Sequence, residues 1–105
     1  MILHVHSTGL NATPTLREHL ERRLAFALGR FGEEVGQVRV WLADTNGPRG
    51  GVDKQVRLRV QGRRLKTLVV TDSDANLLAA IDRATERIGN AIARALDRAR
   101  TLRRR

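Results

Sequence analysis

Residues 55–61 read Gln55-Val56-Arg57-Leu58-Arg59-Val60-Gln61, a strict alternation of polar and apolar side chains. Because successive side chains of a strand point to opposite faces of a sheet, this pattern predicts a strand with one buried face. The stretch Val38-Arg39-Val40-Trp41-Leu42-Ala43 has the same period and predicts a second such strand. Between them, residues 46–51 contain three glycines and a proline and predict an irregular loop.

Two further strands are predicted on either side of this pair. Residues 2–8 alternate apolar and polar side chains and predict a short strand near the start of the chain. After a tight turn at residues 61–64, residues 65–71 predict a fourth strand. The three consecutive apolar residues at 68–70 interrupt the alternation, so the pattern leaves open which face of this strand is buried.

A first helix is predicted from Pro14 to Phe31. Thr13 suits the N-cap, and Pro14 suits the first helical position, where its missing N–H costs nothing. Gly32 follows the last apolar residue, at a position where a left-handed residue commonly ends a helix. One stripe of the helix is apolar and consists of Leu16, Leu20, Leu24, Ala27 and Phe31.

A longer second helix is predicted from about Ala75 to Arg100. Asp72 or Ser73 is expected to cap it, and the position of Asp74 near the helix N-terminus is expected to be favourable for the same electrostatic reason. Its apolar stripe consists of Leu77, Ile81, Ala84, Ile88, Ile92, Ala95 and Ala99.

The resulting order is β-α-β-β-β-α, which predicts an α+β fold. We expect a two-layer sandwich, in which a four-stranded sheet carries both helices on one face and buries their apolar stripes. One domain is expected over residues 1–100, followed by an arginine-rich tail at 101–105.

The composition excludes several classes of function. The chain has 105 residues, 41% of them hydrophobic, and no cysteine, which rules out disulfides, thiolate metal sites and thiol catalysis. No apolar run is long enough to cross a membrane, and the first residues do not resemble a secretory signal. We therefore expect a cytoplasmic domain that needs no cofactor and takes no small-molecule substrate.

The charge balance points to a polyanionic partner. There are 20 basic and 11 acidic residues, a net charge of +9, and all but two of the basic residues are arginine. On a helical wheel, Arg83, Arg87, Arg94 and Arg98 lie within about 60° of one another, so they form a ladder along the second helix. Guanidinium groups one or two turns apart can follow successive phosphates of a nucleic acid, with strong dependence on salt.

The first helix offers a second basic flank. Arg23, Arg30 and His19 share one side of it with Phe26, an aromatic residue that lies outside the apolar stripe. Arg22 lies close to this flank.

Three segments, taken in order, resemble one protein family. They are Thr13-Pro14-Thr15-Leu16-Arg17-Glu18-His19-Leu20, Gly50-Gly51-Val52-Asp53-Lys54 and Leu78-Ala79-Ala80-Ile81-Asp82. They are similar to the start of the first helix, the approach to the third strand and part of the second helix in ribosome hibernation-promoting factors. These proteins are also called ribosome-associated translation inhibitors or sigma 54 modulation proteins. The resemblance spans about residues 2–98.

The resemblance implies a fold similar to double-stranded-RNA-binding domains, and a protein that acts on ribosomes under stress. Family members bind the small ribosomal subunit, alone or within the 70S ribosome, near the mRNA path and the tRNA sites, and so block translation. Basic residues of both helices contact 16S rRNA. The positions here that fit this pattern are Arg22, Arg23, Arg30, Arg83, Arg87, Arg94 and Arg98, and Lys54 is expected to add a contact beside the glycine-rich loop.

The chain departs from the family pattern at several positions. The start of the second helix reads Asn76-Leu77-Leu78 and lacks an aromatic residue that is common there. Ala25, Phe26 and Leu28 stand where relatives often carry lysine, which thins the basic patch of the first helix. The chain is therefore expected to be a short, single-domain form without the family's dimerisation domain.

Two other functions fit the residues. One is a general module for structured RNA. The other is a protein-interaction domain that uses the open face of the sheet, where Arg39, Trp41, Arg57 and Arg59 are expected to lie. From the pattern alone, Trp41 is as well suited to stack on a nucleotide as to cover the sheet.

The sequence predicts neither a metal site nor an enzyme. His4 and His6 share one face of a strand, as two metal ligands would, but no third ligand is visible nearby. No combination of residues has the spacing of an activated nucleophile or an acid–base pair.

Overall fold

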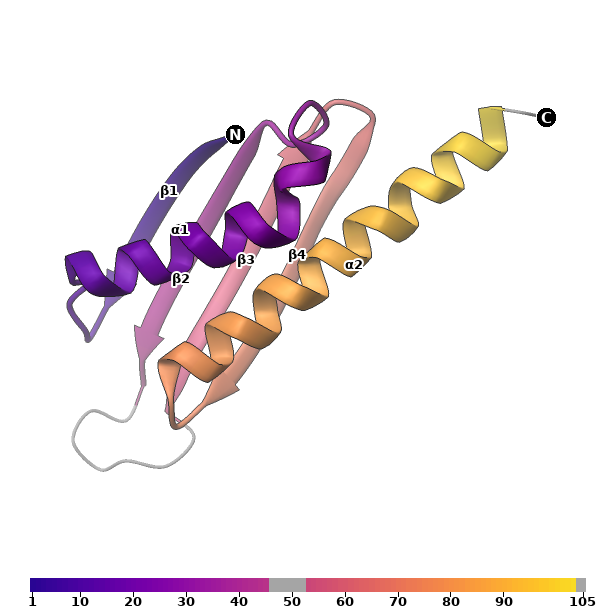
Figure 1. The fold of residues 1–105 in the computed structure, drawn as a ribbon. Coiled ribbons are helices and arrows are strands. Elements are labelled where there is room, and N and C mark those ends of the chain that lie inside the picture. Colours follow the sequence, from indigo (N-terminus) through magenta and orange to yellow (C-terminus); the bar gives the residue numbers. More distant parts are fainter. Residues whose placement is uncertain (46–52, 104–105) are drawn as a thin grey trace.

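The computed structural model describes residues 1–45 and 53–103 and contains a four-stranded sheet with two helices on one of its faces (Figure 1). It confirms the predicted α+β fold and the order β-α-β-β-β-α. The elements are β1 (Ile2–Thr8), α1 (Pro14–Leu28), the short 3₁₀ helix η1 (Gly29–Phe31), β2 (Gln37–Asp44), β3 (Lys54–Gly62), β4 (Leu65–Asp74) and α2 (Leu77–Arg103). The predicted loop at 46–51 lies outside the described residues.

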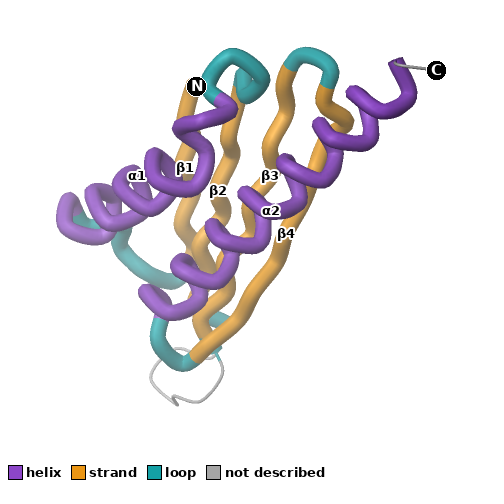
Figure 2. Tube along the Cα trace, turned by 45° about the vertical axis from the view of Figure 1, so that its right-hand side comes forward, coloured by secondary structure: helices purple, strands orange, loops and turns teal. Residues whose placement is uncertain are grey.

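The strands lie in the sheet in chain order, β1-β2-β3-β4. β1 and β2 are parallel because α1 carries the chain back between them, whereas the other two pairs are antiparallel. Seen from the side, the helices form one layer and the sheet the other (Figure 2). The C-terminal turns of α2 extend past the end of the sheet (Figure 1).

The core lies between the two layers. The alternating apolar residues of β2 and β3 all face the helices and are at most 1% exposed: Val38, Val40, Leu42, Val56, Leu58 and Val60. They pack against Leu20, Leu24 and Leu28 of α1 and against Ile81, Ile88 and Ile92 of α2. Leu28 adds to the predicted stripe of α1, while Leu16, Ala27 and Phe31 are half-buried at its edge.

The facing of β4 follows from its pairing with β3. Leu68 and Val70 lie opposite the buried Val60 and Leu58, so they face the helices. Val69 lies between them on the outer face and is 47% exposed. The alternation is therefore kept through the apolar run, and the outward position simply carries a valine.

The end of the first helix differs from the prediction. The α-helix stops at Leu28, and η1 continues it to Phe31. Gly32 has φ −53°, which is right-handed, so the expected left-handed cap is wrong. The tighter turn accounts for this difference because the Phe31 carbonyl accepts the N–H groups of Glu34 and Val35 at 2.8 and 3.0 Å.

The start of the second helix also differs. β4 continues to Asp74 because Asp72, Ser73 and Asp74 pair with residues 54–56 of β3, and α2 begins only at Leu77. The residue that caps it is Asn76, whose Oδ1 accepts the Leu78 N–H at 2.9 Å. The prediction that Asp72 or Ser73 caps the helix is therefore wrong. At its other end α2 reaches Arg103, and residues 104–105 of the predicted tail lie outside the described residues.

Two glycines offer a matched test of the packing at one end of the sheet. A Cβ on Gly62 would lie 1.8 Å from the Glu34 carbonyl oxygen, whereas one on Gly29 would meet no atom within 4 Å. We expect Gly62→Ala to lower the free energy of unfolding by about 3 kcal/mol, because backbone must move to admit the methyl group. Gly29→Ala is expected to raise it by about 0.5 kcal/mol, since Gly29 already has helical angles. Urea denaturation of both variants measures the difference, and equal midpoints would contradict the close contact at Gly62.

Candidate nucleic-acid interface

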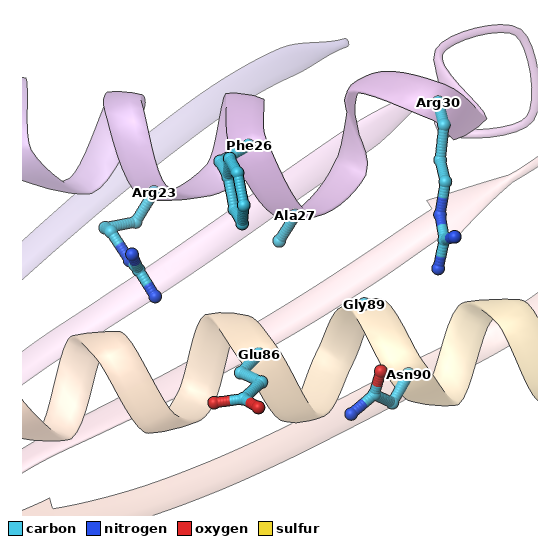
Figure 3. Close-up of a pocket in the computed structure, with 7 residues that line it drawn as sticks. All are labelled: Arg23, Phe26, Ala27, Arg30, Glu86, Gly89 and Asn90. Carbon is cyan, nitrogen blue, oxygen red and sulfur yellow. The ribbon is translucent and has the colours of Figure 1, made fainter.

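A groove runs between α1 and α2 on the side of the helices that faces away from the sheet (Figure 3). Its volume is about 490 Å³. The helices approach closely at its floor, where a Cβ on Gly89 would lie 3.1 Å from the Ala27 carbonyl oxygen. Its residues are Arg23, Phe26, Ala27, Arg30, Glu86, Gly89 and Asn90. The groove therefore brings the basic flank of the first helix up against the second helix.

The α1 side of the groove combines cations with an aromatic ring. Arg23 and Arg30 lie on either side of Phe26, and all three side chains extend toward α2 (Figure 3). The guanidinium of Arg23 is 5.8 Å from the centre of the Phe26 ring, and that of Arg30 is 4.6 Å from the centre of the Phe31 ring. Phe26 is 83% exposed, which confirms that the core does not use it.

Asp82 of α2 neutralises part of this flank. Its Oδ1 lies 2.8 Å from His19 Nε2 and 3.3 Å from Arg23 Nε. The carboxylate thus links the two helices and already partners Arg23, one of the predicted RNA contacts. The sequence places Asp82 on α2 but gives no sign of this pairing, because the residues are 59 to 63 positions apart.

The N-terminal half of the arginine ladder is also paired with acids. Arg83 Nη2 lies 3.1 Å from Asp72 Oδ1 and 2.8 Å from Asp74 Oδ2, and it donates to the Ser73 carbonyl as well. Arg87 Nη1 donates to the Thr71 carbonyl at 3.1 Å and lies 3.5 Å from Asp72 Oδ2. α2 alone looks poor in acids beside its arginines, but the edge strand β4 supplies them.

These contacts shift the ionisation of the groups involved. The hydrogen bond from Arg83 holds the pKa of Asp72 below its ordinary value, and the Asn76 N–H followed by Arg83 does the same for the pKa of Asp74. The hydrogen bonds to Asp72 and Asp74 in turn raise the pKa of Arg83. The carboxylates therefore stay charged wherever the protein is folded near neutral pH.

Lys54 lies at the same end of the sheet and is paired in a similar way. Its Nζ is 2.9 Å from Asp53 Oδ2 and 3.1 Å from Asp44 Oδ2, and these hydrogen bonds, that to Asp53 first, raise its pKa. Its register partner on β4 is Asp74, which places Lys54 near Arg83 and away from the groove. The tertiary structure thus joins Lys54 to the basic ladder through shared acids.

The remaining predicted contacts are exposed. Arg22, Arg94 and Arg98 form no ion pair with the residues that the structure describes, and Arg30 contacts only an aromatic ring. The positive charge that is available to a partner on the helices therefore lies on α1 and on the C-terminal half of α2.

The outer face of the sheet is a second basic surface. Two neighbouring rows across it read His4-Arg39-Arg59-Val69 and His6-Trp41-Arg57-Thr71. The described rows on either side add Ile2, Gln37 and Gln61, and Thr8, Ala43, Gln55 and Ser73, so none of these four rows carries an acid. We call this surface the sheet face. The alternation in β2 and β3 already indicated it, although the absence of acids becomes clear only once the register is known.

Trp41 organises the sheet face. Its ring is stacked with His6 from β1, with centroids 6.0 Å apart and planes at 20°. The guanidinium groups of Arg57 and Arg59 from β3 each lie 5.3 Å from the ring centre. Neighbours from both adjoining strands thus contact the ring, which favours a role in positioning cations over an open stacking surface.

Other kinds of site are not found in the described part of the chain. No group of three or more His, Asp or Glu side chains there is arranged to hold a metal ion. Among the described helices, none is long and apolar enough to cross a bilayer.

Comparison with known proteins identifies relatives. The family model described as Sigma 54 modulation protein / S30EA ribosomal protein matches residues 3–100. The N-terminal domain of Protein Y from Thermus thermophilus superimposes with a TM-score of 0.76 and 24% identity, over 90% of this chain and 98% of that one. A ribosomal subunit interface protein from Coxiella burnetii gives a TM-score of 0.75 and 15% identity, over 90% and 96%. No curated protein matches the sequence significantly.

The Asp72–Arg83 contact predicts a specific dependence of stability on pH. A carboxyl group whose pKa is lower in the folded than in the unfolded state stabilises the fold above the unfolded value of about 3.9. That contribution is lost as the pH falls through the lower, folded value. We expect Asp72→Asn to unfold more easily at neutral pH and to lose less stability between about pH 5 and pH 2 than the unmodified protein does.

Urea midpoints over this pH range measure the effect. Glu33→Gln is a suitable control, because Glu33 is exposed and forms no ion pair with described residues. If Asp72→Asn and Glu33→Gln show the same pH dependence, the interpretation of the Asp72 contact is wrong.

Proposed function

The chain belongs to the Sigma 54 modulation protein / S30EA ribosomal protein family, and from this premise we propose that it is a ribosome-associated translation inhibitor. It binds the small ribosomal subunit, alone or in the 70S ribosome, near the mRNA and tRNA sites, and blocks translation under stress. It acts in the cytoplasm, by steric occlusion rather than by catalysis. The helices provide the contact surface for 16S rRNA.

The observation that carries this proposal is the row of exposed arginines along the two helices. α2 presents Arg94 and Arg98 without acidic partners among the described residues, and α1 adds Arg22 and Arg30. Because they come from two packed helices, these cations form a fixed array and not a set of independent charges. Phosphates of a structured RNA are suited to such an array, because each contact releases condensed counterions.

The paired cations contribute differently to the proposed interface. Arg23, Arg83, Arg87 and Lys54 each already contact a carboxylate. To bind a phosphate, these groups must share or exchange that partner, which reduces the net gain. We therefore assign most of the binding energy to the exposed arginines and a secondary role to the paired ones.

A pair of charge-reversal variants tests the surface. Arg87→Glu with Arg94→Glu is expected to abolish co-sedimentation with 30S and 70S particles in sucrose gradients, because repulsion replaces attraction at two points of the ladder. Arg57→Glu with Arg59→Glu on the sheet face changes the net charge by the same amount and serves as the matched control. We expect the control to retain most of the binding to particles.

The outcome separates this function from a general module for structured RNA. Binding to 30S and 70S but not to 50S particles, resistant to excess duplex RNA, supports a fitted small-subunit ligand. Equal binding to all three particles that disappears with modest added salt contradicts it. Loss of binding in the sheet-face pair alone would contradict the use of the helices.

A second candidate function rests on the sheet face. Arg39 and Arg59 are direct cross-strand partners of like charge, and the Nε of Arg39 is buried without an acceptor among the described residues. Adjacent like charges destabilise a sheet, so an acidic partner protein or a second copy of the chain that presents acids would relieve the repulsion.

Trp41→Ala tests this second function. The substitution removes the ring that contacts Arg57 and Arg59, so those side chains lose their fixed positions. If the sheet face binds a second copy, sedimentation velocity will show weaker self-association while ribosome binding is unchanged. A protein that is monomeric at all concentrations, with or without the substitution, excludes the second copy as the partner.

A further inference from the structure

Phe26 occupies an unusual place for a large aromatic side chain. It is 83% exposed near the middle of the surface formed by the two helices, and the core is complete without it. Arg23 precedes it by one turn and Arg30 follows it by about one turn, so the ring lies between two cations (Figure 3). Within the described residues, Arg23 is the only side chain whose ring contact with Phe26 is close enough to count as cation–π. Most of the ring surface therefore remains open to a ligand.

The opposite side of the groove carries hydrogen-bonding groups. Glu86 and Asn90 lie one turn apart on α2 and border the groove across from Phe26 (Figure 3). Both side chains are exposed, and neither forms a hydrogen bond with another described residue. Glu86 supplies acceptors, whereas Asn90 supplies both a donor and an acceptor. The carboxylate of Glu86 also disfavours a bare phosphate at this point, so an anion is directed to the flanking arginines.

These parts match the parts of a nucleotide. An aromatic ring is complementary to the face of a base, amide and carboxylate groups to its edge, and arginines to the phosphates on either side. We propose that the groove binds one unpaired nucleobase of an RNA strand, stacked on Phe26, with its amino-bearing edge toward Glu86 and Asn90. Arg23 and Arg30 bind the neighbouring phosphates. This inference rests on the proposed function and identifies which feature of the RNA the helices recognise.

Comparison with Trp41 explains why the groove is favoured over the sheet face for stacking. The Trp41 ring already contacts His6 on one neighbouring strand and two guanidiniums on the other. A base would have to displace these groups. Phe26 is free of this competition, and the cations beside it are placed to hold the strand rather than to cover the ring.

Substitutions at Phe26 test the stacking directly. We expect Phe26→Ala and Phe26→Leu each to weaken binding to 30S particles and to the single-stranded hexamer of cytidine by about tenfold to a hundredfold. Phe26→Trp is expected to bind at least as tightly as the unmodified protein, because its ring is larger. Val69→Ala removes an exposed apolar side chain from the sheet face and is the matched control, with binding expected to be unchanged.

The pattern among the variants discriminates between occupants. If Phe26→Leu restores what Phe26→Ala loses, the groove needs bulk and not a ring, and the inference is overturned. If Phe26→Ala weakens 30S binding but leaves hexamer binding unchanged, the groove contacts a ribosomal protein, and the inference is again overturned.

Glu86→Gln tests the recognition of the base edge. Cytosine and adenine present an amino group to a carboxylate, whereas uracil presents carbonyl oxygens beside its single N–H. We expect the unmodified protein to bind cytidine and adenosine hexamers severalfold more tightly than the uridine hexamer, and Glu86→Gln to reduce this ratio. An unchanged ratio would contradict the assigned contact.

The two proposals fail in different ways. If the unmodified protein binds no ribosomal particle, the proposed function is wrong, and the hexamer titrations still decide whether the groove binds a base. If the protein binds 30S particles and Phe26→Ala behaves like Val69→Ala in both assays, the groove inference is wrong and the proposed function stands.

Discussion

The burial of Ile81, Ile88 and Ile92 against the sheet fixes the orientation of α2, and the arrangement of charge depends on it. All three side chains are fully buried, so the helix cannot turn about its axis without exposing them. Its arginines must then point along one side. Arg83 and Arg87 extend to the edge strand β4, whereas Arg94 and Arg98 lie farther along the helix, beyond the aspartates of that strand. One packing contact thus separates the ladder into a paired half and an exposed half.

The distribution of acids matters more for the interface than the net charge of +9. Asp72, Asp74 and Asp82 each engage an arginine that would otherwise be available to a nucleic acid. What remains on the helices is a smaller set of cations around a groove that also holds an exposed phenylalanine. The sheet face is the reverse case, because its arginines have no acid among them and are held by a tryptophan. The same excess of arginine therefore gives two surfaces with different chemistry.

Sequence patterns predicted the strands and helices well, and local capping less well. The alternation in β2 and β3 and the apolar stripe of α2 correspond directly to buried side chains. Asp72 and Ser73, by contrast, were expected to cap a helix and instead lie in β4. Aspartate and serine are suited to caps in isolation, but here their backbone groups pair with β3, and this long-range hydrogen bonding takes precedence over the local preference. The same holds at Gly32, where hydrogen bonds of a tight turn replace the left-handed cap.

The sequence by itself determined the family, the order of elements, the side of each element that is buried and the residues that carry positive charge. It could do so because periodicity and composition are local properties of the chain. Only the tertiary structure decided which of those charges are compensated: Arg83 by Asp72 and Asp74, Arg23 by Asp82, and Lys54 by Asp44 and Asp53. It also brought Phe26 of α1 opposite Glu86 and Asn90 of α2. Electrostatic and stacking contacts depend on distances of a few ångströms, and most of these distances join residues that are far apart in the chain.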